Sequence, residues 1–78
     1  METTKKEDKL IKNLGERIAE LRKTKGYTQV TFSEKSGIHR AALAKIENGR
    51  VNPTVIVLNR ISECLGIELH ELLKMNVK

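Results

Sequence analysis

The side chains best suited to chemistry in this sequence are cations, and the excess positive charge lies in one segment. Residues 22–50 contain seven Lys and Arg residues and two Glu residues, so this segment carries the whole formal net charge of +5 of the 78-residue chain. Clustered cations attract phosphate groups, so the segment is a candidate nucleic-acid contact. A solvated helical surface has the same charge pattern, and charge alone leaves both interpretations open.

Other chemistries find little support in the sequence. Cys64 is the only cysteine, which excludes an internal disulfide and a cysteine-based metal site. We interpret Cys64 as a small buried hydrophobe, with a redox switch as the alternative. His39 and His70 lie too far apart in the sequence for a local metal motif. There is no Gly-rich phosphate loop and no Ser/His/Asp constellation, so we expect no enzyme, cofactor, metal site or small-molecule ligand.

Length and composition favour one small helical domain. A chain of 78 residues has material for a single core. Its apolar residues are mostly Leu, Ile, Val and Ala, with one Pro and no Trp, which favours an all-α fold. No segment reaches the roughly 20 apolar residues needed to span a bilayer, and no signal peptide is evident. We therefore expect a cytoplasmic, nucleoid-associated protein with no membrane contact.

Glycines and capping residues divide the chain into five short helices. Four glycines each follow a segment with helical apolar spacing, where a left-handed residue commonly ends a helix: Gly26, Gly37, Gly49 and Gly66. Thr28 and Thr54 are suited to cap the helices that follow them. The polar residues 1–8 are expected to form a flexible arm before a domain of residues 9–76. The predicted helices span about residues 9–24, 28–36, 39–48, 54–65 and 68–75.

The apolar spacing also predicts which side of each helix is buried. In chain order, the residues expected to face the core are Leu10, Leu14, Ile18, Leu21, Phe32, Leu43, Ile46, Val55, Leu58, Ile61 and Leu65. The third helix then turns Arg40, Ala41, Ala44 and Lys45 outward.

The second and third predicted helices form a candidate helix-turn-helix over residues 28–48. They meet at Gly37, and the apolar Ile38 that follows is expected to point inward. This unit sets its second helix into the major groove of DNA. A short corner between two helices also occurs in unrelated proteins, so the spacing favours DNA binding without establishing it.

Several short motifs in and around this unit resemble one family. They are Tyr27-Thr28-Gln29, Ser33-Glu34-Lys35-Ser36-Gly37-Ile38, Ile46-Glu47-Asn48-Gly49-Arg50 and Asn52-Pro53-Thr54. Together they resemble the lambda-repressor-like, Cro/cI-type (XRE) helix-turn-helix family, and the resemblance extends from about Leu14 to Leu73. It implies a compact five-helix domain that binds double-stranded DNA and regulates transcription.

The resemblance also implies roles for particular residues. Arg40, Ala41 and Lys45 match the base-reading positions of the family. Arg40 can donate two hydrogen bonds to guanine, Lys45 can donate to guanine less rigidly, and Ala41 can contact a thymine methyl. Thr28 and Gln29, at the start of the second helix, match phosphate-contacting positions.

The roles of three further candidates stay open between a DNA contact and ordinary structure. His39 either touches a phosphate or occupies the N-cap of the third helix, and we favour the N-cap. Asn48 and Arg50 match positions near the DNA backbone, although a helix C-cap and a solvated charge explain them nearly as well. Arg22 and Glu47 match a pair that forms a structural salt bridge in the phage repressors of this family.

A homodimer is the expected assembly. The fourth helix is unusually apolar at Ile56 and Val57, and these residues could join others near the C-terminus in a self-complementary patch. The remaining predicted interface residues are Leu69, Leu72, Leu73 and Met75. The alternative is an apolar monomer surface over ordinary core residues.

The resulting functional prediction is a dimeric repressor or autoregulator that acts on a palindromic operator. A phage-type repressor, a controller protein of a restriction-modification system and an antitoxin all fit this description. The competing prediction is a protein-interaction module that retains the fold and acts mainly through a partner protein.

Overall fold

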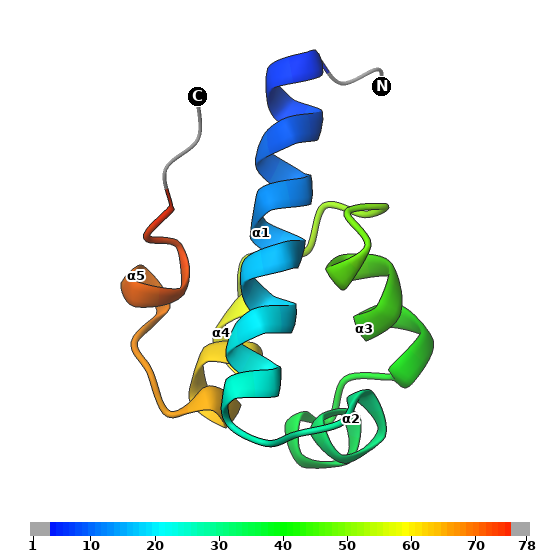
Figure 1. The fold of residues 1–78 in the computed structure, drawn as a ribbon, viewed down its shortest axis with the longest axis vertical. Helices are drawn as coiled ribbons and strands as arrows, with labels where there is room; N and C mark the ends of the chain where they lie inside the picture. The colour runs from blue at the N-terminus through cyan, green and yellow to red at the C-terminus, as the bar shows by residue number, and fades with distance from the viewer. Residues whose placement is uncertain (1–3, 76–78) are drawn as a thin grey trace.

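A computed structural model describes residues 4–75 as five helices around one core (Figure 1). The helices are α1 (Lys5–Thr24), α2 (Gln29–Ser36), α3 (Arg40–Glu47), α4 (Val55–Leu65) and α5 (Leu69–Leu72). In Figure 1, α1 runs along the length of the molecule, with α2 and α3 on one side and α5 on the other. The all-α prediction is confirmed.

The helix-turn-helix forms where the sequence predicts it. The Thr28 side chain accepts a hydrogen bond from the backbone N–H of Thr31, so α2 begins directly after it. Gly37 ends α2 with φ +74°, a left-handed conformation that residues with a side chain rarely adopt. Ile38 follows and is buried, as expected. The chain therefore turns sharply into α3.

The core is aliphatic with one aromatic side chain at its centre. It consists of Leu14, Ile18, Phe32, Ile38, Leu43, Ile46, Leu58, Ile61, Leu65 and Leu72. Two predicted core residues are wrong, because Leu10 is 44% exposed and Val55 is 67% exposed. Leu10 lies in the N-terminal part of α1, where every residue from Thr4 to Leu10 is exposed, and Val55 is the first residue of α4. No helix among residues 4–75 is both long enough and apolar enough to cross a bilayer.

The prediction of a flexible arm over residues 1–8 is wrong for residues 5–8, which belong to α1. Helix α1 begins at Lys5, and Thr4 and Glu7 form a reciprocal capping box. Residues 1–3 of the predicted arm lie outside the described residues. At the other end, α5 is only four residues long and stops at Leu72 rather than at residue 75. Its position is fixed by Arg17 of α1, whose guanidinium donates to the carbonyl oxygens of Glu71 and Leu72.

Gly15 allows α1 and α3 to approach closely. A Cβ atom built at this position would lie 2.3 Å from the carbonyl oxygen of Ile46 and 2.7 Å from that of Glu47. Both neighbours are backbone atoms of α3, so they cannot rotate away as a side chain would. The sequence pattern assigns this glycine no role, yet it sets the separation of α1 from α3.

We predict that Gly15→Ala destabilises the protein, although alanine normally stabilises a helix interior by up to about 1 kcal/mol relative to glycine. The added methyl group must push α1 and α3 apart, and overpacking of this kind costs about 1–3 kcal/mol. Urea unfolding followed by circular dichroism measures the change. Glu16→Ala, at the next, exposed position of α1, is the matched control and should change stability by less than about 0.5 kcal/mol. A Gly15→Ala protein as stable as the wild type would contradict the close approach.

Candidate nucleic-acid interface

A buried ion pair joins the end of α1 to the end of α3. Arg22 Nε donates to Glu47 Oε2 at 2.7 Å, and Arg22 Nη2 donates to Glu47 Oε1 at 2.9 Å. The two side chains are only 8% and 4% exposed. This is the bidentate geometry that makes Arg–carboxylate pairs both strong and directional. The pair that the family resemblance implies is therefore present.

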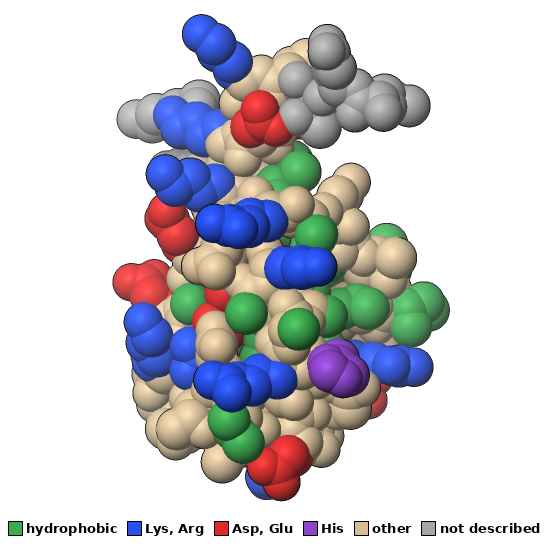
Figure 2. Space-filling model, turned by 90° about the vertical axis from the view of Figure 1, so that its right-hand side faces the viewer, with side chains coloured by type: hydrophobic (Ala, Val, Ile, Leu, Met, Phe, Trp, Pro, Cys, Tyr) green, Lys and Arg blue, Asp and Glu red, His purple; other side chains and the backbone are tan. Residues whose placement is uncertain are grey.

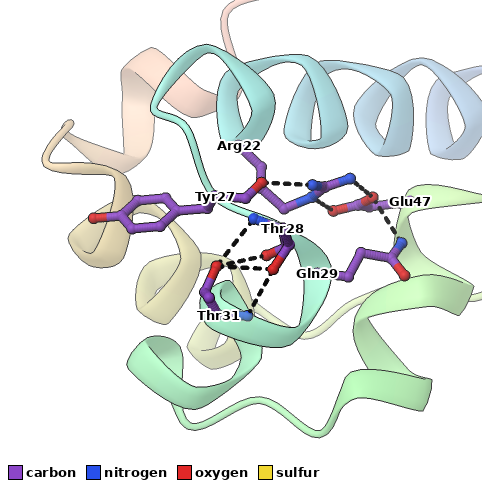
Figure 3. Close-up of polar contacts among 6 residues, drawn as sticks. All are labelled: Arg22, Tyr27, Thr28, Gln29, Thr31 and Glu47. Atoms are coloured by element: carbon purple, nitrogen blue, oxygen red, sulfur yellow. Dashed lines mark hydrogen bonds and ion pairs between the residues drawn. The ribbon is translucent and has the colours of Figure 1, made fainter.

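Two further hydrogen bonds extend this pair to the start of α2 (Figure 3). Arg22 Nη1 donates to the carbonyl oxygen of Tyr27 at 2.8 Å. Gln29 Nε2 donates to Glu47 Oε1 at 3.0 Å. Within residues 4–75, no buried side-chain nitrogen or oxygen lacks a hydrogen-bond partner. The network therefore fixes the N-terminus of α2 and the C-terminus of α3 relative to one another.

The residues predicted to read bases lie on the solvent side of α3. Arg40, Ala41 and Lys45 are exposed, whereas Leu43 and Ile46 of the same helix are buried. Ala44, also expected to face outward, is half-buried. The exposed side of α3 therefore combines two long cations with a small side chain between them, which leaves room for base edges to approach.

The predicted phosphate contacts surround α3. Gln29 is half-buried and uses one amide hydrogen on Glu47, so its second amide hydrogen stays available to an anion. Thr28 is exposed at the N-cap of α2. His39 occupies the N-cap of α3, but its side chain accepts no cap hydrogen bond. Asn48 occupies the C-cap of α3 and, like Arg50, is exposed.

A depression of about 570 Å³ brings several of these residues together. It lies between the end of α1 and the first turns of α2 and α3. Its lining includes Arg22, Gln29 and Arg40, and also Lys23 and Val30, which the sequence did not single out as site residues. Lys23 belongs to the basic segment 22–50, and this membership is the sequence signal that could have identified it as a site residue. Figure 2 shows Lys and Arg side chains gathered on the face of the molecule that carries α3.

Some residues of the predicted dimer surface are exposed in the structure, and others are buried. Ile56 is 66% exposed and Leu73 is also exposed. Leu72 is fully buried and packs in the core, so its assignment to the dimer interface is wrong. Val57, Leu69 and Met75 are half-buried and pack against the core. Apolar side chains at helical spacing can line either a core or a dimer interface. Only the packing of the short α5 shows which of these side chains belong to the core.

Cys64 is half-buried, and desolvation raises the pKa of its thiol above the usual value, with the positive charge of Lys35 opposing the shift. The reactive thiolate form is therefore disfavoured. Among residues 4–75, no group of His, Cys, Asp and Glu side chains is arranged to hold a metal ion.

The fold and the arrangement of α2 and α3 are those of a helix-turn-helix protein, and comparison with known proteins identifies the family. The Helix-turn-helix family model matches residues 18–72. The chain belongs to the lambda-repressor-like, XRE-type helix-turn-helix family. It is therefore a DNA-binding transcription regulator and not an enzyme.

Curated relatives are transcription regulators. The HTH-type transcriptional regulator y4dJ of Sinorhizobium fredii is 41% identical over 61 residues, which cover 78% of this chain and 79% of y4dJ. SinR of Bacillus subtilis is 38% identical over 61 residues, covering 77% of this chain and 55% of SinR. The immunity repressor of Bacillus phage phi105 is 39% identical over 56 residues, covering 72% of this chain and 39% of the repressor. The last two relatives are thus considerably longer than the matched region.

Solved structures share the fold. The restriction-modification controller protein C.AhdI from Aeromonas hydrophila superposes with a TM-score of 0.75 at 35% identity, covering 81% of this chain and 94% of its own. The clp gene regulator ClgR from C. glutamicum superposes with a TM-score of 0.77 at 26% identity, covering 82% of each chain.

We predict that Glu47→Ala lowers the free energy of unfolding by about 3–5 kcal/mol, because it leaves the Arg22 guanidinium buried without its counter-charge. Urea denaturation measures the loss. Glu34→Ala, which removes an exposed glutamate of α2, is the control and should be near neutral. Replacing both partners, as Arg22→Met with Glu47→Leu, should recover part of the lost stability. A Glu47→Ala protein that keeps full stability but changes its DNA sequence preference would contradict the structural role.

Proposed function

We propose that the protein is a homodimeric repressor that binds a palindromic operator and regulates its own gene. The observation that carries the proposal is the exposed side of α3, with Arg40, Ala41 and Lys45 directed to solvent on a helix whose C-terminus is held by the buried Arg22–Glu47 pair. A rigidly held helix with donors on its outer side is suited to the major groove. Arg40 and Lys45 then read guanine, and Ala41 contacts a thymine methyl.

The phosphate contacts in this proposal flank α3, the helix proposed to read the bases and called the reading helix below. Thr28 and Gln29 lie at the N-terminus of α2, where free backbone N–H groups favour an anion. His39, Asn48 and Arg50 lie at the two ends of α3 and are exposed. Contacts on both sides of the reading helix fix its register in the groove without reading sequence themselves.

Dimerisation rests on exposed apolar side chains. Val55 and Ile56 lie side by side in the first turn of α4, and each is about two-thirds exposed. Leu73 adds a third exposed apolar side chain beyond α5. A twofold dimer would place two α3 helices about 34 Å apart, one turn of DNA. The similarity to an immunity repressor and to a restriction-modification controller protein supports a regulator of this kind. Such a protein acts on the chromosome, so we also place it at the nucleoid.

We predict that the purified protein retards its own upstream DNA in a mobility-shift assay with excess nonspecific competitor. Arg40→Ala should weaken operator binding by about 1–3 kcal/mol and relax the preference for guanine at one position of each half-site. Binding-site selection with wild type and variant measures the preference. Lys25→Ala, which removes another exposed cation of the basic segment, is the matched control and should keep the preference. A selected site without guanine opposite Arg40 would refute the base-reading assignment.

We predict that Ile56→Glu shifts the protein toward monomer and weakens binding to a full palindrome more than to a single half-site. A charge at this position opposes burial against a second copy. Sedimentation at micromolar concentration measures the assembly. Leu10→Glu, which adds the same charge in place of an exposed apolar side chain of α1, is the control and should leave the dimer intact. A wild-type protein that sediments only as monomer would refute the dimer. If the protein also retards no DNA, the competing protein-interaction role is favoured.

A further inference from the structure

The N-terminal part of α1 is helical but contributes nothing to the core. Every residue from Thr4 to Leu10 is exposed, and the first buried residue of the helix is Leu14. This part of α1 extends past the other helices (Figure 1). The capping box of Thr4 and Glu7 closes its first turn. Its sequence is therefore free of packing constraints, while its backbone is held in a defined direction.

Three lysines occupy one side of this part of α1. Lys5, Lys9 and Lys12 follow one another at i, i+4 and i+7, so they share one helix face, and all three are exposed. Glu16, one turn further on, marks the end of this basic face. We refer to Lys5, Lys9 and Lys12 as the α1 lysine row. At 1.5 Å rise per residue the row covers roughly 10 Å of helix.

The α1 lysine row begins directly beside the end of the reading helix. A Cβ atom at Gly49 would lie 2.9 Å from Cα of Lys12, so the backbones of α1 and of the turn after α3 are in contact there. Gly49 lies between Asn48 and Arg50, both exposed. Figure 2 shows Lys and Arg side chains forming a column on this face, from the N-terminal end of α1 down to the region of α3. The lysines thus extend the basic surface of α3 rather than forming a separate patch.

We propose that the α1 lysine row binds the phosphate backbone of the DNA next to the phosphates reached from the C-terminal end of α3. Lysine ammonium groups on flexible stems suit phosphates, which need a positive charge but no fixed donor geometry. The row meets the turn after α3 at Lys12, so DNA in contact with the exposed side of α3 passes close to it. Its contacts add affinity and salt dependence without reading sequence.

The salt dependence of DNA binding tests the proposal. Log affinity falls linearly with log salt, with a slope of about −0.9 for each phosphate neutralised. In Lys9→Gln with Lys12→Gln the slope should be shallower by about 1.8 for each bound protomer. The affinity deficit should then grow by about 60-fold per protomer for each tenfold decrease in salt. The same change is expected on an operator duplex and on a nonspecific duplex, because the lost contacts are to the backbone.

The control removes the same charge from another face. Lys6 lies three helical turns before Arg17, whose guanidinium bonds α5, so it faces the α5 side of α1. Lys6→Gln with Lys74→Gln lowers the net charge equally and should leave the slope close to that of the wild type. Lys9→Arg with Lys12→Arg keeps the charge and should keep the slope. Gln has a helix propensity similar to that of Lys, and circular dichroism verifies that α1 is retained.

Equal slopes for the Lys9/Lys12 and Lys6/Lys74 variants would overturn the proposal, because general charge would then account for any loss. An unchanged slope in the Lys9/Lys12 variant would also overturn it, since the row would then serve another anion or none. The slope is expressed per bound protomer and is also measured on nonspecific DNA, so it depends neither on dimerisation nor on a specific operator. A monomeric protein or one without a palindromic operator would therefore refute the proposed function and leave this measurement valid.

Discussion

The Arg22–Glu47 ion pair is the interaction on which the arrangement of α1, α2 and α3 depends. Removing two charges from water is expensive, and the cost is offset only if the geometry is good and the remaining donors and acceptors are satisfied. Here the guanidinium also bonds a backbone carbonyl and the carboxylate also accepts from Gln29. An apolar pair could fill the same volume, but it would give neither direction to the Gln29 amide nor a fixed position to the end of α3. The pair therefore orients as much as it stabilises.

The parts of the fold that the sequence predicts well are those set by short-range chemistry. Thr28 and Thr54 accept backbone hydrogen bonds from residues three positions ahead, and Gly37 and Gly66 end their helices in the left-handed conformation. Such signals act within one turn of helix and need no tertiary contact. The buried Arg22–Glu47 pair could be expected only from family resemblance, because its partners are 25 residues apart and nothing local connects them.

The errors share a physical origin. Leu10 and Leu72 have similar local patterns, yet the first extends past the core and the second is buried in it, because only tertiary packing decides which apolar side chain finds neighbours. Gly15 matters through the backbone of a distant helix. The start of α1 is different, since its Thr-x-x-Glu capping signal is local, whereas the polar composition of residues 1–8 is typical of a flexible arm.

Helix α3 keeps its two tasks on separate sides. Leu43, Ile46 and Glu47 hold it to the body, while Arg40 and Lys45 face solvent and contribute nothing to the core. Under the proposed function, mutation at the outer positions therefore alters which DNA is recognised without threatening folding. In evolutionary terms, a duplicated gene of this kind can acquire a new target by a few substitutions while its scaffold stays under unchanged selection. The common fold of relatives at 26–35% identity is consistent with that separation.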